Sequence, residues 1–388
     1  MSSPQHIIIV AGEASGDMHA AHLVATLRER DPRLIFSGVG GPQMQRAGVK
    51  LYEDLTKIAV VGFVEVLKHF SEFRRIFHLI LAKVKETKAR TVILVDYPGF
   101  NLRLTRELKK HNVQVIYYVS PQVWAWKENR VEFIKTHVDK MLVLFEFEKK
   151  FYAERGLDVE FVGHPLIDTI KVQKPKQEFL RSLGLPADKL TIGILPGSRP
   201  KEIENLLPPM LEAADILNRE FSGRIQFLLL KAPTISSESL QKYFRKNLMT
   251  SLRAVSLPLK IVDNQTYDGI NAAEVCMVAS GTATLETAIL NKPMVVVYKT
   301  APLTYWLAKQ LVKIPHIAMA NVVAGKKIVP ECIQHEATGP KIAQELKNIF
   351  TNELRVAEMK AELLKVKNSL GGPGAINRAA LCILKLLP

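Results

Sequence analysis

Cysteine is scarce in this sequence. Cys276, Cys332 and Cys382 are the only three among 388 residues, and each lies far from the others in apolar surroundings. This usage argues against a disulfide framework or a cysteine metal cluster, and it is consistent with a reducing cytoplasm.

Long apolar runs are also missing. No uninterrupted segment approaches the roughly 18–20 apolar residues that a membrane-spanning helix needs. The first six residues lack the positive lead of a signal peptide, and the apolar run after them is too short. We therefore expect a protein that is soluble, or that attaches to a membrane surface without spanning it.

The two best-known glycine-rich phosphate signatures are absent. Residues 12–17 (GEASGD) and 38–42 (GVGGP) are glycine-rich, but neither contains Gly-x-Gly-x-x-Gly, and there is no Walker A sequence. An Asp-x-Asp metal motif is missing too. Acidic residues are outnumbered, 38 against 53 lysines and arginines, for a formal net charge of +15. Such a balance favours anionic partners: phosphorylated substrates, a membrane surface or nucleic acid.

What the sequence does contain is a regular alternation of apolar runs and helix-period segments. A chain this long exceeds the roughly 250–300 residues of one hydrophobic core, so two domains are expected. The predicted strands are residues 6–11, 34–39, 91–95, 114–119, 140–144, 159–162, 190–195, 224–230, 259–262, 275–279 and 294–297. Most are continuously apolar and end in Gly, Pro, Ser or Asp, which is typical of parallel sheets covered by helices on both faces. The sequence thus predicts an α/β protein with two Rossmann-like domains.

The predicted domain boundary lies near residues 163–168 (GHPLID), and the polar stretch 171–177 follows it. We expect an N-terminal domain over residues 1–165 and a second domain over residues 166–338. Residues 339–388 are predicted to form helices, interrupted at Gly-Gly-Pro-Gly (371–374), that pack back on the N-terminal domain.

Two strand-to-helix turns in the second half predict a diphosphate site. In the first turn, Ser198 and Arg199 precede a proline at the first helical position, which is how a helix start with outward N–H groups begins. In the second turn, Ser280, Gly281 and Thr282 follow an apolar strand. Glu286 lies one turn further, placed either for ribose hydroxyls or simply for a favourable charge on the helix dipole.

The first half offers several candidates at strand ends. Asp96 directly follows an apolar strand, where it could act as a general base or only steady an Asx-turn. Glu13, Ser15 and Asp17 lie in the first loop, and Asp17 could equally cap its helix. Trp124, beside a second tryptophan and a lysine, could grip a ligand or pack between domains.

Residues 63–85 have apolar positions on one helical face, which predicts a helix that packs on the core for most of its length. Phe63, Phe70 and Phe73 lie among basic residues near its start. This composition also fits a surface that meets anionic lipid.

Taken together, these motifs resemble the lipid-A-disaccharide synthases, and the resemblance covers nearly the whole chain in order. It rests on AGEASGD (11–17), GVGGPQM (38–44), VGFVEVL (61–67), DYPGFN (96–101), YVSPQVWAWK (118–127), FVGHPLID (161–168), LPGSR (195–199), SGTATLE (280–286) and PMVVVYK (293–299).

The resemblance implies a GT-B architecture, with two Rossmann-like domains facing across a cleft, and no metal or cofactor. It implies the donor UDP-2,3-diacylglucosamine and the acceptor 2,3-diacylglucosamine 1-phosphate (lipid X), joined by an inverting reaction into a β-1,6-linked disaccharide with release of UDP. It also implies docking on the cytoplasmic face of the inner membrane, an anionic surface, with a homodimer left open.

The candidate site residues fall into three groups, each an expectation, and Asn321 and Gln334 are included only for their chemistry. The catalytic base is Asp96, Glu13 or His19. The UDP-binding residues are Ser198, Arg199, Ser280, Gly281, Thr282, Glu286, Asn321 and Gln334. The acceptor- and lipid-binding residues are Ser15, Asp17, Asn101, Trp124, Phe63, Phe70 and Phe73.

Two other functions remain as alternatives. A UDP-N-acetylglucosamine 2-epimerase uses a similar two-domain nucleotide-sugar fold but needs no acyl-binding surface. Nucleic-acid binding would use the positive charge. However, the basic residues are dispersed and no recognisable nucleic-acid module is present, so no nucleic-acid partner is expected.

Overall fold

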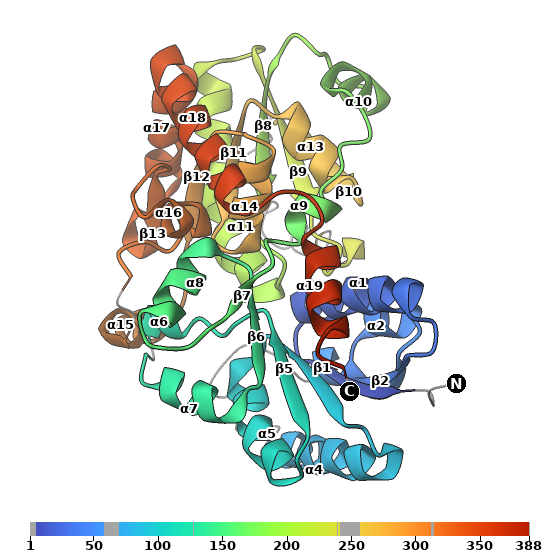
Figure 1. The fold of residues 1–388 in the computed structure, drawn as a ribbon. Coiled ribbons are helices and arrows are strands. Elements are labelled where there is room, and N and C mark those ends of the chain that lie inside the picture. The colour runs from blue at the N-terminus through green and yellow to red at the C-terminus, as the bar shows by residue number, and fades with distance from the viewer. Residues whose placement is uncertain are drawn as a thin grey trace. The chain divides into compact units, whose positions relative to one another are not determined.

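The computed structural model describes residues 5–57, 70–126, 128–238, 240, 257–311 and 314–387. The chain forms two compact units (Figure 1). Unit 1 contains Met1–Asp168 and Leu370–Pro388, and unit 2 contains Thr169–Ser369. Each unit is built around its own parallel sheet, so the prediction of two Rossmann-like α/β domains is confirmed.

The sheet of unit 1 has seven parallel strands in the order β3-β2-β1-β4-β5-β6-β7. Their bounds are β1 His6–Ala11, β2 Ile35–Gly40, β3 Lys50–Asp54, β4 Thr91–Val95, β5 Gln114–Tyr118, β6 Lys140–Val143 and β7 Glu160–Phe161. The chain runs outward from β1 to β3 and then returns to pair β4 with the other side of β1. This reversal is the switch point at which open α/β sheets bind ligands, beyond the carboxyl ends of the strands.

Helices cover both faces of this sheet. They are α1 Ala14–Arg30, α2 Pro42–Arg46, α4 Phe70–Thr87, α5 Pro98–Lys110, α6 Val123–Trp126, α7 Arg130–His137, α8 Glu146–Ala153, α9 Leu166–Thr169 and α19 Ala375–Leu384, with a 3-10 turn η1 at Leu55–Lys57. Ile76 and Ile80 of α4 pack in one core cluster with Ile8 and Val10 of β1. Side chains alternate along a strand, so α1, which lies over Ala11, covers the opposite face.

The end of the chain returns to unit 1 through a short set of hydrogen bonds. The amide of His164 donates to the carbonyl of Leu370 (2.8 Å), and the carboxylate of Asp168 accepts from the amides of Gly374 and Ile376 at the start of α19. The guanidinium of Arg378 donates to the carbonyl of Val162 (2.8 Å). α19 then packs on α1.

The tail 339–388 is therefore divided, whereas the sequence prediction treated it as one segment. α17 (Gly339–Phe350) packs on α11, and α18 (Glu353–Ser369) packs on α14 and α16, all in unit 2. Apolar faces drive this placement: Ile342 and Leu346 of α17 and Leu363 of α18 are fully buried. Only residues 370–388 belong to unit 1.

Unit 2 repeats the strand order of unit 1. Its six parallel strands lie in the order β10-β9-β8-β11-β12-β13, and the reversal falls between β8 and β11. The strands are β8 Leu190–Leu195, β9 Ile225–Lys231, β10 Leu259–Asp263, β11 Val275–Ala279, β12 Met294–Tyr298 and β13 Glu331–Ile333. The other elements are α10 Lys176–Ser182, α11 Pro200–Glu220, α13 Thr266–Ala272, α14 Thr282–Ile289, α15 Pro302–Leu311, α16 Met319–Ala324 and the 3-10 turn η2 Gln334–Glu336.

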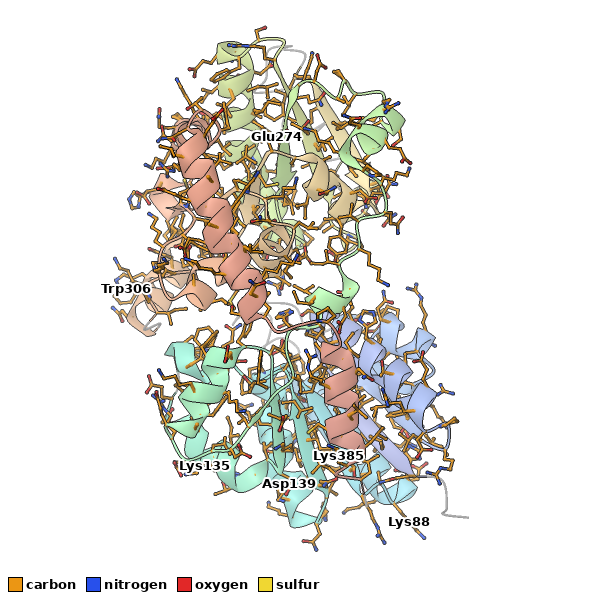
Figure 2. The ribbon with its side chains drawn as sticks, turned by 45° about the horizontal axis from the view of Figure 1, so that its top comes forward. Lys88, Lys135, Asp139, Glu274, Trp306 and Lys385 are labelled. Carbon is orange, nitrogen blue, oxygen red and sulfur yellow. The ribbon has the colours of Figure 1, made fainter. Side chains whose placement is uncertain are left out.

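Acidic side chains stabilise the entry to strands at the amino edge of each sheet, far from the carboxyl ends. Glu274, labelled in Figure 2, accepts from the amide of Thr191 at the start of β8 (2.7 Å) and pairs with Lys176 of α10. In unit 1, Asp139 accepts from the amide of Val115 in β5 (2.7 Å) and pairs with Lys109.

Every predicted strand is present, but β3 and β13 were not predicted. β3 is a polar edge strand (KLYED) without a continuous apolar run, and β13 is only three residues long. The predicted helix over residues 63–85 begins within its described part as α4 at Phe70, while Phe63 lies outside the described residues. Among the helices described, none combines the length and apolarity that crossing a bilayer requires.

The buried Asp17 carboxylate provides a stability test of unit 1. Its two oxygens accept hydrogen bonds from the amides of Gly41 (2.8 Å), Gln43 (2.9 Å) and Met44 (3.0 Å), and thereby cap α2 from α1. Removing the acceptor would leave buried N–H groups unsatisfied. We expect Asp17→Ala to lower the free energy of unfolding by about 2–4 kcal/mol.

Urea denaturation measures this effect. Glu29→Gln, at an exposed position on the same helix, is the matched control and should change stability little. Equal stability of the Asp17→Ala variant and the parent protein would contradict this account of the cap.

Candidate functional site

Two acidic residues follow the neighbouring strands β1 and β4 of unit 1. β1 and β4 are paired through Ala11 and Val95, so Glu13 and Asp96 emerge at the same edge, at the switch point of the sheet. Desolvation by burial, followed by the charge of Glu13, raises the pKa of Asp96 to about 7. A carboxyl group with such a pKa can accept a proton near neutral pH.

The backbone at Asp96 is strained and firmly held. Asp96 (φ 50°) and Tyr97 (φ 48°) both adopt left-handed conformations that residues with side chains rarely take. The carbonyl of Asp96 accepts hydrogen bonds from the Asn101 amide (2.8 Å) and from the hydroxyl of Tyr117. The Asp96 carboxylate accepts from the backbone amide of Tyr97, and among the described residues no side chain donates to it. The peptide is therefore fixed while the carboxyl group stays available.

Gly12 is required beside this turn. A Cβ atom at Gly12 would lie 2.3 Å from the ring of Tyr97, so any larger residue would displace the ring. The ring itself packs on Phe73 and Phe100. The glycine of the first loop thus serves the Asp96–Tyr97 turn through a steric constraint that the sequence pattern alone did not reveal.

His19 differs from Asp96 in its protonation. Burial, with a smaller contribution from His22, lowers the pKa of His19 to about 4, and the neighbouring His164 has its pKa lowered to about 3 by the same effect of burial. The two rings meet edge to face, with centroids 6.2 Å apart. A neutral imidazole with so low a pKa is a weak base. Of the two candidates with shifted pKa values, Asp96 therefore fits proton abstraction better, and the assignment stays a prediction.

The other polar candidates of unit 1 hold the structure together. The side-chain amide of Asn101 donates to the carbonyls of Val95 and Asp96, which makes it a support of the Asp96 turn. The indole of Trp124 is buried and donates to Glu148 (3.2 Å). Asp17 caps α2, as described above, and Ser15 is partly buried in the first turn of α1. Their predicted contacts with acceptor or lipid are not tested by these arrangements.

Glu148 was missed by the sequence analysis. Its buried carboxyl group accepts from the hydroxyl of Ser120, from Trp124 and from the amides of Leu144 and Phe145. Burial raises its pKa to about 7. The sequence did contain one signal for this role. Glu148 is the third residue of α8, a position from which a glutamate can cap the start of its own helix.

The two phenylalanines at the start of α4 lie differently. Phe70 is 57% exposed, whereas Phe73 is partly buried and packs on Tyr97 and Phe100. The preferred prediction, that this helix packs on the core, holds from Phe73 onward.

In unit 2, the turn after β8 carries Ser198 and Arg199 at the switch point. Gly197 has a φ of 118°, which favours glycine. The amides of Ser198 (2.8 Å) and Arg199 (3.3 Å) donate to one oxygen of Glu202, and the other oxygen lies 3.3 Å from the guanidinium of Arg199. The prediction of outward, open N–H groups is therefore wrong for these two amides, because a carboxylate of the same helix takes them.

The turn after β11 differs in being uncapped. Gly281 (φ 145°) precedes α14, where a Cβ atom would meet no atom within 4 Å, and the helix start has neither a side-chain cap nor an acidic residue in its first turn. The hydroxyl of Ser280 donates to the carbonyl of Ile317 (3.0 Å). Since β8 and β11 are paired, this helix start lies at the same edge as Arg199. An uncapped helix N-terminus at the same sheet edge as an arginine suits an anionic group.

Glu286 lies one turn into α14. Burial raises its pKa to about 7, so near neutral pH it exists partly as a carboxylate that can accept hydroxyl donors. Gln334 forms a two-way bridge to Thr300, accepting from its amide (2.7 Å) and donating to its carbonyl (3.1 Å).

Asn321 was expected to bind UDP, but its side chain is used within the protein. It is fully buried, donates to the carbonyl of Val329 and to Glu331, and accepts from the amides of Ile328 and Val329. Every hydrogen-bonding position of the side chain is used within this loop. This geometry makes Asn321 a scaffold residue and lends no support to a contact between its side chain and a nucleotide.

Within the described ranges, no three His, Cys, Asp or Glu side chains gather in a group that could hold a metal ion. The three cysteines are unpaired as thiols.

Comparison with known proteins identifies the family. A sequence model described as lipid-A-disaccharide synthetase matches residues 7–384. The lipid-A-disaccharide synthase of Syntrophus aciditrophicus is 41% identical over 381 residues, covering 98% of this chain and 97% of the relative. The enzyme of the same name from Myxococcus xanthus is 39% identical over 388 residues, covering 100% and 99%.

Solved structures share the fold at low identity. A Staphylococcus aureus MnaA structure with UDP has a TM-score of 0.66 at 13% identity, covering 99% of this chain and 98% of that one. Acinetobacter baumannii MurG has a TM-score of 0.58 at 14% identity, covering 98% and 100%. A putative UDP-N-acetylglucosamine 2-epimerase from Listeria monocytogenes has a TM-score of 0.63 at 13% identity, covering 100% and 98%.

The epimerase alternative is thus reduced to a distant relation in fold, while relatives at about two-fifths identity cover the whole chain. The predicted GT-B class and the predicted activity are confirmed. The chain belongs to the family of lipid-A-disaccharide synthases, glycosyltransferases of lipid A biosynthesis.

Proposed function

We propose that this chain transfers 2,3-diacylglucosamine from UDP to the 6-hydroxyl of lipid X, with inversion, to give a β-1,6-linked disaccharide and UDP. The observation that carries the proposal is the matched placement of chemistry at the two switch points. Asp96, with a pKa of about 7, lies at the switch point of unit 1. Arg199 and the uncapped start of α14 lie at the switch point of unit 2.

In the proposed reaction Asp96 is the general base. It takes the proton of the acceptor 6-hydroxyl as that oxygen forms its bond to the anomeric carbon. The bond from that carbon to the diphosphate breaks on the opposite side, and its electron pair leaves with UDP. Such a displacement inverts the anomeric centre and needs no covalent enzyme intermediate. Glu13 would keep the proton affinity of Asp96 high through its charge.

Unit 2 would stabilise the leaving group. The guanidinium of Arg199 and the amides at the start of α14 provide positive charge and dipoles for the diphosphate, the part that a metal ion plays in other enzymes. Glu286 would accept hydrogen bonds from ribose hydroxyls. We therefore propose that the reaction needs neither metal nor cofactor.

Docking on the cytoplasmic face of the inner membrane is part of this proposal, because both substrates carry acyl chains. The support from this chain is its net charge of +15 and the exposed ring of Phe70, the first described residue of α4, with Arg74 four residues further along the helix.

The reaction is tested with the two lipid substrates and the chelator EDTA. We expect equal amounts of UDP and disaccharide, and an unchanged rate in EDTA, since fixed protein groups would neutralise the diphosphate. Chromatography of nucleotide and lipid products measures both. Loss of turnover in EDTA and its recovery with magnesium would contradict the metal-free proposal.

Replacement of the proposed base should affect turnover and not donor binding. We expect Asp96→Asn to lower kcat by about 10²–10⁴-fold, the usual range for a general base, with the Kd for UDP unchanged. Since the carboxylate is the active form, kcat/KM of the parent enzyme should fall as pH falls through about 7.

Asp158→Asn removes the same charge from an exposed position of unit 1 and serves as the matched control. Glu13→Gln should retain more turnover than Asp96→Asn, while lowering the pH at which the rate falls. Full turnover in Asp96→Asn would reject this residue as the base.

Membrane docking through Phe70 is tested with vesicles. We expect Phe70→Ser to weaken co-sedimentation with anionic phospholipid vesicles by about tenfold, because a phenylalanine ring entering the interface contributes up to about 1.5–3 kcal/mol. The unfolding midpoint should stay the same, because the ring is exposed. Leu354→Ser, at an exposed position of unit 2, is the control. Equal binding of the Phe70→Ser variant and the parent would remove Phe70 from the docking surface.

A further inference from the structure

A carboxylate occupies the turn that is proposed to face the diphosphate. One oxygen of Glu202 accepts from the amides of Ser198 and Arg199, and the other lies 3.3 Å from the Arg199 guanidinium. The turn is shaped around this side chain: a Cβ atom on Gly197 would lie 2.4 Å from a Glu202 oxygen and 2.6 Å from its Cβ. Glu202 is therefore built into the turn as one of its parts.

This arrangement limits what the turn can offer an anion. The amides of Ser198 and Arg199 already have an acceptor, and Pro200, the first residue of α11, has no N–H group. A negative charge beside a phosphate site weakens phosphate binding unless it pairs with a positively charged group there. The group that the carboxylate contacts is Arg199, whose side chain is 49% exposed and whose guanidinium lies 3.3 Å from Glu202.

We propose that Glu202 is a positioning residue for the glycosyl transfer. It fixes the Ser198–Arg199 turn and orients the Arg199 guanidinium toward the diphosphate, without touching the donor. The two turns would then bind the diphosphate in different ways. The turn after β8 would contribute a guanidinium, and the turn after β11 would contribute the backbone amides at the start of α14. This inference rests on the proposed role of Arg199 in donor binding.

The chemistry of glutamine separates positioning from capping. In Glu202→Gln the amide oxygen can still accept from the backbone amides of the turn, so the cap of α11 is kept. The amide nitrogen is a donor and cannot pair with a guanidinium, so the contact between residue 202 and the Arg199 guanidinium is lost. A purely structural role for Glu202 would leave UDP binding in this variant unchanged.

The test is a double-mutant cycle on the Kd for UDP, measured by calorimetry with the full chain. We expect Arg199→Ala and Glu202→Gln each to weaken UDP binding about tenfold, the size of one hydrogen bond to a charged group. In the Arg199→Ala background, Glu202→Gln should weaken binding no further, because its only effect passes through the missing guanidinium.

Two further variants complete the test. Glu204→Gln removes the same charge from an exposed position on α11 and should leave the Kd unchanged. Glu202→Asp keeps the charge but is shorter by one methylene, so it cannot reach both the amides and the guanidinium, and it should weaken UDP binding as Glu202→Gln does. Thermal unfolding of each variant reports any loss of fold, and Glu202→Asp replaces Glu202→Gln in the cycle if the latter unfolds.

The outcomes distinguish this inference from the function on which it rests. If Arg199→Ala leaves the Kd for UDP unchanged, the proposed diphosphate contact itself is wrong. If Arg199→Ala weakens binding but Glu202→Gln weakens it by the same factor in both backgrounds, Glu202 acts independently and the positioning role is overturned. Tighter UDP binding in Glu202→Gln would also overturn it, since the carboxylate would then be a competitor of the phosphate.

Discussion

The reversal of strand order in each parallel sheet is the constraint on which the chemistry depends. In unit 1 the chain leaves β1 on one side and returns to it as β4 on the other, and in unit 2 the same happens at β8 and β11. The loops that follow the two central strands diverge to opposite faces, so the edge between them is left open for a ligand. Asp96 and Glu13 meet at one such edge, Arg199 and the start of α14 at the other.

The physical state of these groups is set by their surroundings. Desolvation raises the pKa of Asp96 and of Glu286 to about 7, whereas it lowers that of His19 to about 4, because burial always disfavours the charged form. Asp96 can thereby take up a proton near neutral pH, Glu286 is only partly ionised there, and His19 is a neutral, weak base. The side chains of Asn101 and Tyr117 hold the Asp96 turn by donating hydrogen bonds to the backbone carbonyl of Asp96. Neither of them occupies the carboxyl group, which is proposed to act in the reaction.

How far the sequence predicted the site depended on whether the signal was local. The position of Asp96 could be predicted because a buried apolar strand ends immediately before it. The structural role of Asn321 could not be predicted, because its hydrogen-bond partners lie in an irregular loop whose sequence has no periodic pattern. Glu202 was likewise passed over, because a glutamate in the first turn of a helix has an ordinary reason to be there and its contact with Arg199 appears only in three dimensions.

By itself the sequence determined the alternation of strands and helices along the chain apart from β3 and β13, the parallel character of both sheets, and the family, because continuous apolar runs and ordered motifs are properties of the chain. Tertiary structure decided which polar groups were already satisfied. The amides of Ser198 and Arg199 looked open in sequence and are bound to Glu202, and the tail after residue 339 is divided between the two units. Such outcomes depend on hydrogen-bond partners and packing surfaces that folding brings together from distant or unpatterned positions, and no local pattern encodes them.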